Sequence, residues 1–404
     1  MITFRVRSRA LLALVAASFL AGSAVFAASA RQADACTWTV TPSPNGVADG
    51  DRLWAVAADS NTDAWAVGTY PGTNAQAPLA LHWTGAAWSL VTAAHYGPYD
   101  NGLSGVAAYS ADLAWAVGYY WNGNANEPLI ERWNGKQWGV TSTPAISSPY
   151  GATLNAVTIV SPSDVWAVGS IQTSSSNQGV PNAVTLIEHW NGVRWSIVPS
   201  PNKNSIENVL TGITFNNGND IWAGGIYAPT TPGFDQNLAE HWNGAAWTIV
   251  ATPDATTNTS NNFNAIGAVS STSVFASGDY YNAKDGVFFT LNAHWNGKTW
   301  SLLASPNAGA DFTVLAGVAA VSPTEVVAVG QYVVNSVHRT YAMLWDGTRE
   351  TGLVTPNVYA TGAYFDAASR IPGTSDVWAA GGTLDAPVNG NSQPHQTLIE
   401  RYHC

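Results

Sequence analysis

The sequence contains few charged residues and very little sulfur. Only 10% of its 404 residues are Asp, Glu, Lys or Arg, and there are two cysteines and two methionines. The formal net charge is −11, so the chain has no excess of cations to neutralise nucleic-acid phosphates or anionic lipid headgroups. We therefore expect no nucleic-acid partner and no peripheral contact with a membrane surface.

Motifs for metal, phosphate and covalent chemistry are missing as well. The sequence has no Cys or His cluster with zinc spacing, no Asp-x-Asp-x-Asp-Gly calcium loop and no Gly-rich phosphate loop leading into a helix. It also lacks a Gly-x-Ser-x-Gly nucleophile elbow. We expect no cofactor, no metal and no catalytic residue, which favours a binding protein over an enzyme.

Long apolar runs are scarce too, with one exception at the N-terminus. Three arginines precede an apolar run over 10–26, and Ala28-Ser29-Ala30 follows it as a small-x-small cleavage pattern. This predicts a signal peptide at 1–30 and an extracellular protein with no membrane span in its mature part. The sequence leaves open whether the mature protein is attached to the cell surface. A retained transmembrane anchor is the alternative. Removing the three arginines changes the net charge to −11 − 3 = −14.

What the sequence does contain is a repeat of about 50 residues. A glycine that we interpret as the end of a strand recurs at intervals of 50, 51, 56, 53, 52 and 51 residues, at Gly68, Gly118, Gly169, Gly225, Gly278, Gly330 and Gly381. An apolar strand precedes each glycine-ended strand, and two more strands follow, joined by a turn such as Asn191-Gly192. Seven such repeats predict an all-β, seven-bladed β-propeller with four-stranded blades.

The last repeat is divided between the two ends of the chain. Its third strand, 398–404, stops where the turn should follow, and the fourth strand that it lacks is found at 36–45. This N-terminal segment matches 195–202, the fourth strand of an earlier repeat. We therefore expect residues 31–404 to form one domain whose N-terminal strand completes the last blade.

Closing the ring in this way brings the two cysteines together. Aligning the third and fourth strands of the last repeat with those of an earlier one places Cys404 and Cys36 side by side across the missing turn. In an exported protein, this predicts a disulfide between them. The competing interpretation makes Cys36 a lipid-modified N-terminus, although Asp34 fits such a signal poorly.

The pattern x-x-Asp-x-Trp-Ala-Val-Gly, followed by Trp-Asn-Gly-x-x-Trp, resembles the Trp-rich repeats of secreted bacterial β-propeller proteins. The strand layout is also similar to that of kelch, sialidase-type and photosystem-assembly-factor propellers. The resemblance covers 36–404 and implies a fold without a particular chemistry, because one fold hosts many functions. Phe275 and Val327 replace the second-strand tryptophan in blades five and six, and Glu350 replaces the fourth-strand one.

Residues that recur in every repeat are expected to hold the blades together. Of the 19 tryptophans, all except Trp54 and Trp121 sit at matching strand positions. Histidine or arginine precedes the third-strand aromatic residue in several blades, and glutamate comes one position earlier: His82, His189, His241, His294, Glu131, Glu188, Glu240 and Glu400. Such repeated pairs predict hydrogen bonding between strands rather than acid–base catalysis.

Loop lengths predict where a ligand binds. The connections between second and third strands and between blades are long, and they share one end of the propeller, which we call the long-loop rim. The short connections form the opposite, short-loop rim. Trp54 is predicted at the channel mouth on the long-loop rim and Trp121 in one of its loops. Both could stack on a sugar ring or an apolar ligand, or pack against a neighbouring loop.

Five tyrosines are predicted to join these tryptophans in an aromatic ring around the site. Each follows the repeated glycine by two residues: Tyr70, Tyr120, Tyr227, Tyr280 and Tyr332. Their regular spacing fits a structural role equally well.

These observations favour a secreted, monomeric, non-enzymatic binding propeller that recognises a carbohydrate or cell-surface glycan. One alternative is a polysaccharide-active hydrolase or lyase, which needs two opposed carboxylates. The carboxylates nearest the predicted channel are Asp51, Asp279, Asp311 and Asp366. The other alternative is an extracellular protein-interaction scaffold.

Overall fold

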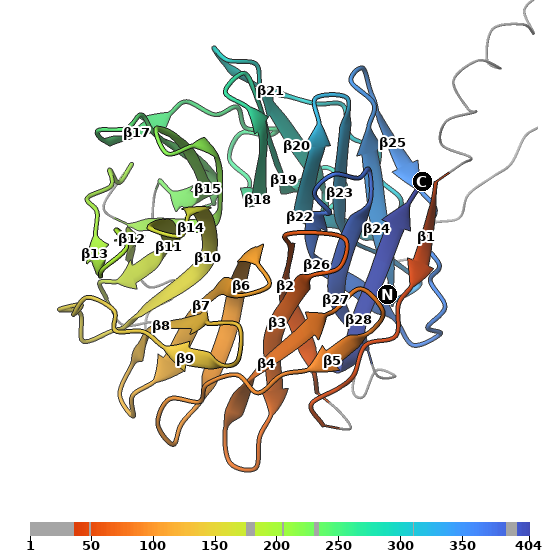
Figure 1. Ribbon diagram of the computed structural model, residues 1–404. Coiled ribbons are helices and arrows are strands. Elements are labelled where there is room, and N and C mark those ends of the chain that lie inside the picture. Colours follow the sequence, from red (N-terminus) through yellow and green to blue (C-terminus); the bar gives the residue numbers. More distant parts are fainter. Residues whose placement is uncertain are drawn as a thin grey trace, which may run out of the picture. The chain divides into compact units, whose positions relative to one another are not determined.

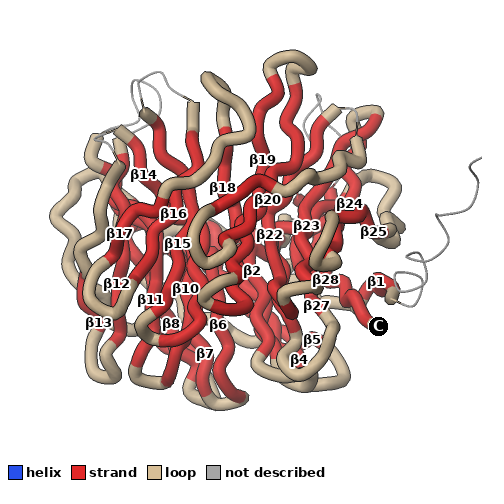
Figure 2. Tube along the Cα trace, turned by 90° about the horizontal axis from the view of Figure 1, so that it is seen from above, coloured by secondary structure: helices blue, strands red, loops and turns tan. Residues whose placement is uncertain are grey.

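The structure, a computed structural model, describes residues 36–47, 50–174, 182–203, 206–229, 234–309, 311–384 and 394–404. The predicted signal peptide at 1–30 lies outside these residues. Within the unit Thr37–Cys404, the strands form seven four-stranded antiparallel sheets that follow one another around a ring (Figure 1). Figure 2 shows the strands in red and the loops that join them in tan. This is the predicted seven-bladed β-propeller.

In the first four blades, the strands are hydrogen-bonded in chain order from the first to the fourth. Blade one is β2 (Arg52–Ala58), β3 (Ala64–Pro71), β4 (Gln76–Trp83) and β5 (Trp88–Leu90); blade two is β6 (Asn101–Ser110), β7 (Leu113–Trp121), β8 (Asn126–Trp133) and β9 (Trp138–Val140). Blade three is β10 (Ala152–Ser161), β11 (Asp164–Gln172), β12 (Ala183–Trp190) and β13 (Trp195–Ile197); blade four is β14 (Glu207–Asn217), β15 (Asp220–Ala228), β16 (Gln236–Trp242) and β17 (Trp247–Val250).

Blades five and six repeat this order, and blade seven closes the ring. Blade five is β18 (Asn261–Ser270), β19 (Ser273–Asn282), β20 (Val287–Trp295) and β21 (Trp300–Leu302); blade six is β22 (Phe312–Ser322), β23 (Glu325–Val334), β24 (Val337–Trp345) and β25 (Glu350–Leu353). Blade seven is β26 (Ala363–Arg370), β27 (Val377–Leu384), β28 (Pro394–His403) and the N-terminal β1 (Thr37–Val40).

Blade seven is closed by both hydrogen bonds and a covalent bond. Strand β1 lies beside β28 (Figure 1), with Trp38 opposite Tyr402. Both cysteines are disulfide-bonded, and because the chain has only two, they form the Cys36–Cys404 bond. The predicted N-terminal closure of the last blade and its disulfide are both confirmed.

Tryptophans fill most interfaces between blades. The ring of Trp65 in blade one lies with its centroid 4.8 Å from those of both Trp133 and Trp138 in blade two. The same three-ring arrangement recurs between blades two and three, three and four, four and five, and seven and one. The repeated tryptophans therefore hold neighbouring blades together, as predicted. Val327 is buried at the corresponding position of blade six.

The aspartate of the repeat motif holds the third-strand histidine. His189 Nε2 lies 2.8 Å from Asp164 Oδ1, and the ring of His189 stacks on that of Trp166 with centroids 4.1 Å apart. Blades one and four repeat this arrangement, and blade seven uses an arginine in place of the histidine. The predicted hydrogen bonding between strands is confirmed for these histidines.

The repeated glycine lies inside the second strand and does not end it, which corrects our expectation. Gly118 of β7 stands opposite Leu103, and the register of β6 shifts between Leu103 and Gly105. This shift is a β-bulge. A Cβ atom on Gly118 would lie 1.9 Å from the carbonyl oxygen of Gly102, and the matching distances in all seven blades are 1.8–2.1 Å. The repeated glycine therefore marks a bulge in the neighbouring strand.

Four third-strand glutamates are buried: Glu131, Glu188, Glu240 and Glu400. Burial raises the pKa of each carboxyl to about 8. Glu131 Oε2 accepts a hydrogen bond from the backbone N–H of Ala94 at 2.8 Å. Since Ala94 lies in the connection between blades one and two, this bond does not join neighbouring strands as we expected for the repeated glutamates.

Candidate functional site

Seven bulge residues form a ring at the mouth of the central channel, on the long-loop rim. Each blade contributes one from its first strand: Trp54, Ser104, Asn155, Thr211, Asn264, Ala316 and Asp366. Together with the residues that follow them, they line a cavity of about 230 Å³. A bulge redirects a side chain out of the regular alternation of a strand.

Polar members of this ring tie one blade to the next. Asn155 Nδ2, Thr211 Oγ1 and Asn264 Nδ2 each donate a hydrogen bond of 2.8 Å. Each acceptor is the carbonyl oxygen that precedes the bulge of the following blade. These three side chains therefore have a structural role at the channel mouth.

An ion pair continues the ring across the seam between blades seven and one. Arg52 Nε and Nη2 donate to the two carboxylate oxygens of Asp366 at 2.8 and 3.0 Å. The guanidinium of Arg52 also lies 3.5 Å from the ring centroid of Trp54, whose Nε1 donates to Thr69 Oγ1 at 3.4 Å. Trp54 thus lies at the channel mouth, where it was predicted, and a guanidinium covers part of it.

The carboxylates considered for a hydrolase or lyase are all engaged by the protein. Asp366 pairs with Arg52, and two asparagine side chains donate to Asp279 at 2.8 Å. Backbone N–H groups donate to Asp51 at 3.2 Å and to Asp311 at 3.1 Å. Burial raises the pKa of Asp279 and Asp366. These four acids are therefore held in structural contacts around the rim.

Four exposed aromatic side chains lie on the long-loop rim beside blade two. Tyr96 and Tyr99 lie in the connection from blade one, Trp121 ends β7, and Tyr150 lies in the connection to blade three. Their exposed fractions are 47%, 46%, 37% and 43%. We call these four residues the aromatic ridge.

Short contacts join the first three members of the ridge. The backbone N–H of Trp121 donates to the carbonyl oxygen of Asp100 at 2.7 Å, which fixes the hairpin tip against the Tyr99 segment. The ring of Tyr99 approaches to 3.3 Å from the position that a Cβ atom on Gly123 would take. The ring of Tyr96 packs edge-on against a neighbouring tyrosine of β7.

The fourth member is joined to the same hairpin tip. Asn124 Nδ2 donates to the carbonyl oxygen of Pro149 at 3.5 Å, next to Tyr150. The backbone N–H of Tyr150 donates a hydrogen bond to Ser148 Oγ at 3.2 Å. Three separate connections therefore present the aromatic ridge from one firmly held surface.

Trp121 corrects a second expectation, because it belongs to a strand and not to a loop. In the hairpin of β7 and β8, Trp121 stands opposite Asn126. The hairpin continues past Gly118 because that glycine accommodates the bulge of β6 while its pairing with Leu129 of β8 remains regular. The other second-to-third-strand hairpins also extend beyond their repeated glycine.

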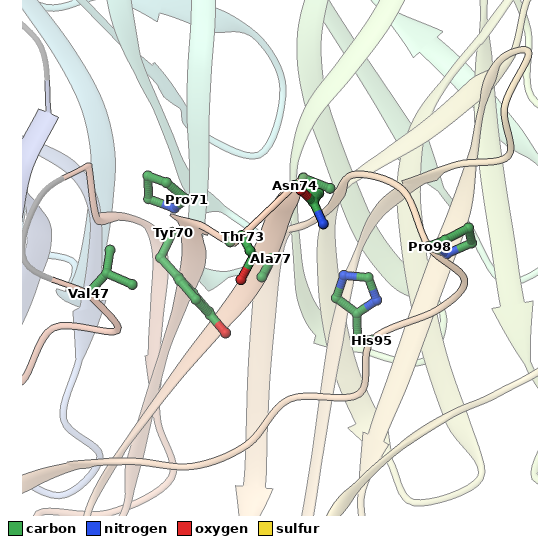
Figure 3. Close-up of a pocket in the computed structure, with 10 residues that line it drawn as sticks. Val47, Tyr70, Pro71, Thr73, Asn74, Ala77, His95 and Pro98 are labelled. Carbon is green, nitrogen blue, oxygen red and sulfur yellow. The ribbon is translucent and has the colours of Figure 1, made fainter.

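A groove lies next to the aromatic ridge on the side of blade one. Its volume is about 550 Å³, and Tyr70, Thr73, Asn74, His95 and Pro98 are among the residues that line it. Figure 3 shows Tyr70 on one side, His95 and Pro98 on the other, and Thr73 between them. The groove thus offers both polar and apolar surface to a ligand.

The five predicted tyrosines pack into different parts of the propeller. Each lies against an apolar cluster of its own, so all five have structural contacts: Tyr70, Tyr120, Tyr227, Tyr280 and Tyr332. Tyr70 also lines the groove, and Tyr120 packs 4.5 Å from Tyr96 of the ridge. Tyr227 packs under Lys203, and Tyr280 packs on Phe289.

Sequence reasoning missed Tyr96, Tyr99, Tyr150 and His95. All four fall in connections between blades, where the repeat has no counterpart to compare. A signal was present in the segment 95–102, which places two tyrosines among glycine, proline and aspartate. Aromatic residues in such a loop have little core to fill, which makes them candidates for binding.

In the part of the chain that the structure describes, no group of three or more His, Cys, Asp or Glu side chains is arranged to hold a metal ion. The same part of the chain includes no helix of the length and apolar character needed to cross a bilayer.

Solved structures share the fold of this chain at low sequence identity. A structure described as YCF48 bound to D1 peptide matches with a TM-score of 0.54 and 12% identity, over 91% of this chain and 95% of that one. YCF48 from Cyanidioschyzon merolae matches with a TM-score of 0.53 and 14% identity, over 91% and 98%. A PL25 ulvan lyase matches with a TM-score of 0.54 and 11% identity, over 89% and 94%.

No protein-family model matches the chain, and no curated protein matches it in sequence. At identities below 25%, the structural likenesses concern the propeller fold alone.

Proposed function

We propose that this protein is an exported, monomeric binding propeller, not an enzyme, and that it holds a glycan against the aromatic ridge. The observation that carries this proposal is the gathering of Tyr96, Tyr99, Trp121 and Tyr150, all exposed, on one firmly held surface. Large exposed aromatic side chains on a rigid scaffold offer flat apolar faces next to polar tips. Sugar rings have matching apolar C–H faces and polar hydroxyls.

The groove supplies the hydrogen-bonding groups that stacking alone lacks. The side chains of Thr73, Asn74 and His95 all line it and can exchange hydrogen bonds with sugar hydroxyls. Because His95 directly precedes Tyr96 in the chain, the groove and the ridge lie on the two sides of one connection. An extended glycan could therefore contact both.

Export is supported by the N-terminal sequence pattern and by the disulfide. Disulfides persist in oxidising compartments and are rare in the reducing cytosol. The absence of catalysis is supported by the contacts of Asp51, Asp279, Asp311 and Asp366, which leave these acids bound to protein groups. Binding without chemistry is the function that this arrangement favours.

The test is binding of the mature chain to an array of glycans and polysaccharides, followed by affinity measurements on any ligand found. We expect Trp121→Ala and Tyr99→Ala each to weaken binding about tenfold or more, since one lost stacking contact of about 1.4 kcal/mol corresponds to a factor of ten. Circular dichroism and thermal melting establish that the variants are folded.

Tyr109→Ala is the matched control. Tyr109 is 45% exposed, as much as the ridge tyrosines, but it lies near the end of β6 on the short-loop rim. Its removal should leave the affinity unchanged. Equal losses for Tyr109 and Tyr99 variants, or no binding to any glycan, would refute the proposal and point to a protein partner instead.

A further inference from the structure

We infer that the glycan bound at the aromatic ridge carries no carboxylate or sulfate groups, an inference that rests on the proposed function. The inference comes from the distribution of charge around the ridge and the groove. It narrows the ligand to uncharged polysaccharides and excludes uronic-acid and sulfated polymers.

Cations are missing from the part of the chain that forms the site. The sequence has no lysine or arginine between Arg52 and Arg132, a stretch that includes three ridge residues and nearly the whole groove. Arg52 itself is occupied by Asp366 and covered by aromatic rings. Recognition of carboxylate or sulfate groups ordinarily uses such cations, arginine above all.

Two exposed cations of blades two and three lie on the other side of the propeller, while a third, Lys203, lies on the long-loop rim between blades three and four and packs over Tyr227. Lys136 and Arg194 are exposed and lie in the turns between third and fourth strands, on the short-loop rim. They are therefore separated from the aromatic ridge by the length of the blade strands. A polyanion at the ridge gains little from them, because such distances exceed the range of unscreened attraction.

Two carboxylates flank Trp121 instead. The backbone of Asp100 accepts the N–H of Trp121, and the exposed carboxylate of Asp100 accepts the N–H of Gln76 at 2.7 Å. On the other strand of the hairpin, Glu127 Oε1 accepts the side-chain amide of Asn122 at 3.0 Å. These acids accept hydrogen bonds from neutral donors such as sugar hydroxyls, whereas they repel carboxylate and sulfate groups.

The test compares ligands that share a backbone and differ in charge. Dextran is paired with dextran sulfate, and fully methyl-esterified polygalacturonate with its de-esterified form, alongside neutral glucans, mannans, xylans and galactans. We expect a neutral polymer to bind in a manner that Trp121→Ala weakens, and its charged counterpart to bind at least tenfold more weakly at low salt, with the difference shrinking as salt is added.

Two lysine variants test whether charge is the cause. Asn74 is exposed and lines the groove, so Asn74→Lys should raise the affinity for the charged counterparts at low salt. Gln137→Lys adds the same charge to an exposed turn on the short-loop rim and should change nothing. Equal responses of the two variants would refute the electrostatic argument.

The outcomes separate the two proposals. Binding of the charged polymer as tightly as the neutral one, still dependent on Trp121, would overturn this inference while leaving glycan binding at the ridge intact. Binding of no polymer at all would overturn the proposed function and this inference with it.

Discussion

The Cys36–Cys404 disulfide occupies the place that a peptide bond holds in the other blades. In blade three, Trp190 pairs with Trp195, and Gly192 and Val193 stand at the centre of the turn that joins them. In blade seven, Tyr402 pairs with Trp38 in the same register, so that Cys404 and Cys36 stand at the central turn positions. The propeller is therefore covalently continuous across the seam between β28 and β1.

Replacing Cys36 and Cys404 together by serine should lower the free energy of unfolding by on the order of 5 kcal/mol. The disulfide closes a loop of nearly the whole chain, and the entropy that it removes from the unfolded state grows with loop length. Denaturant titration of both proteins measures the difference. A negligible loss would mean that the pairing of β1 with β28 closes the ring without covalent help.

Gly225→Ala should destabilise the propeller by about 3 kcal/mol or more. The added Cβ would lie 2.0 Å from the carbonyl oxygen of Val209, which belongs to the bulged strand and cannot move freely. Gly139→Ala is the control, since a Cβ there meets nothing within 4 Å. It should change stability by less than about 0.5 kcal/mol. Comparable denaturation midpoints for both variants would contradict the close-approach explanation.

The melting temperature should fall as the pH rises from about 5 to 9. Burial raises the pKa of Glu188 from 4.5 to about 8 in the folded protein, so the folded state holds its proton more tightly than the unfolded state does. The resulting stability is fully present below pH 4.5 and is lost as the pH rises through 8.

Glu188→Gln removes this titration with nearly the same side-chain volume. We expect the variant to match the natural protein near pH 5 and to melt at a higher temperature near pH 8.5, because a neutral amide replaces a carboxyl that must ionise. Scanning calorimetry across this pH range measures both curves. A parallel pair of curves would show that Glu188 keeps its ordinary pKa.

The tyrosines two residues after the repeated glycine should divide into two groups. Tyr70→Ala should weaken glycan binding, because Tyr70 lines the groove. Tyr280→Ala and Tyr332→Ala should leave the affinity unchanged and lower stability by about 2 kcal/mol, since both pack into apolar clusters of other blades. Equal losses of affinity in all three variants would instead support the predicted aromatic ring.

The architecture could be predicted because the repeat exposes it at several independent positions. Tryptophan spacing, the Asn-Gly turns and the divided last blade all required the same ring, and two cysteines marked its seam. The end of the second strand could not be found in this way. A glycine such as Gly118 normally interrupts a strand, and its real cause is a bulge in the neighbouring strand, which sequence alone does not reveal.

Only part of the candidate site could be predicted from the sequence, for a related reason. Trp54 and Trp121 stood out as exceptions to a pattern, whereas Tyr99 and Tyr150 lie where no pattern exists. Their importance depends on the contacts of three separate connections around Gly123 and Asn124. Such convergence is a property of the folded chain, so a search through one repeat at a time misses it.

Val327 determines where the closed ring is weakest. A ring of blades opens only where two neighbouring blades separate or where one blade splits, and the seam inside blade seven, between β28 and β1, is closed by a covalent bond. Where the other blades insert a tryptophan, or in blade five Phe275, into the next one, blade six inserts a smaller valine, so its boundary with blade seven has the least aromatic packing. We therefore expect transient opening, whether caused by an applied force or detected by a protease, to begin at the boundary between blades six and seven.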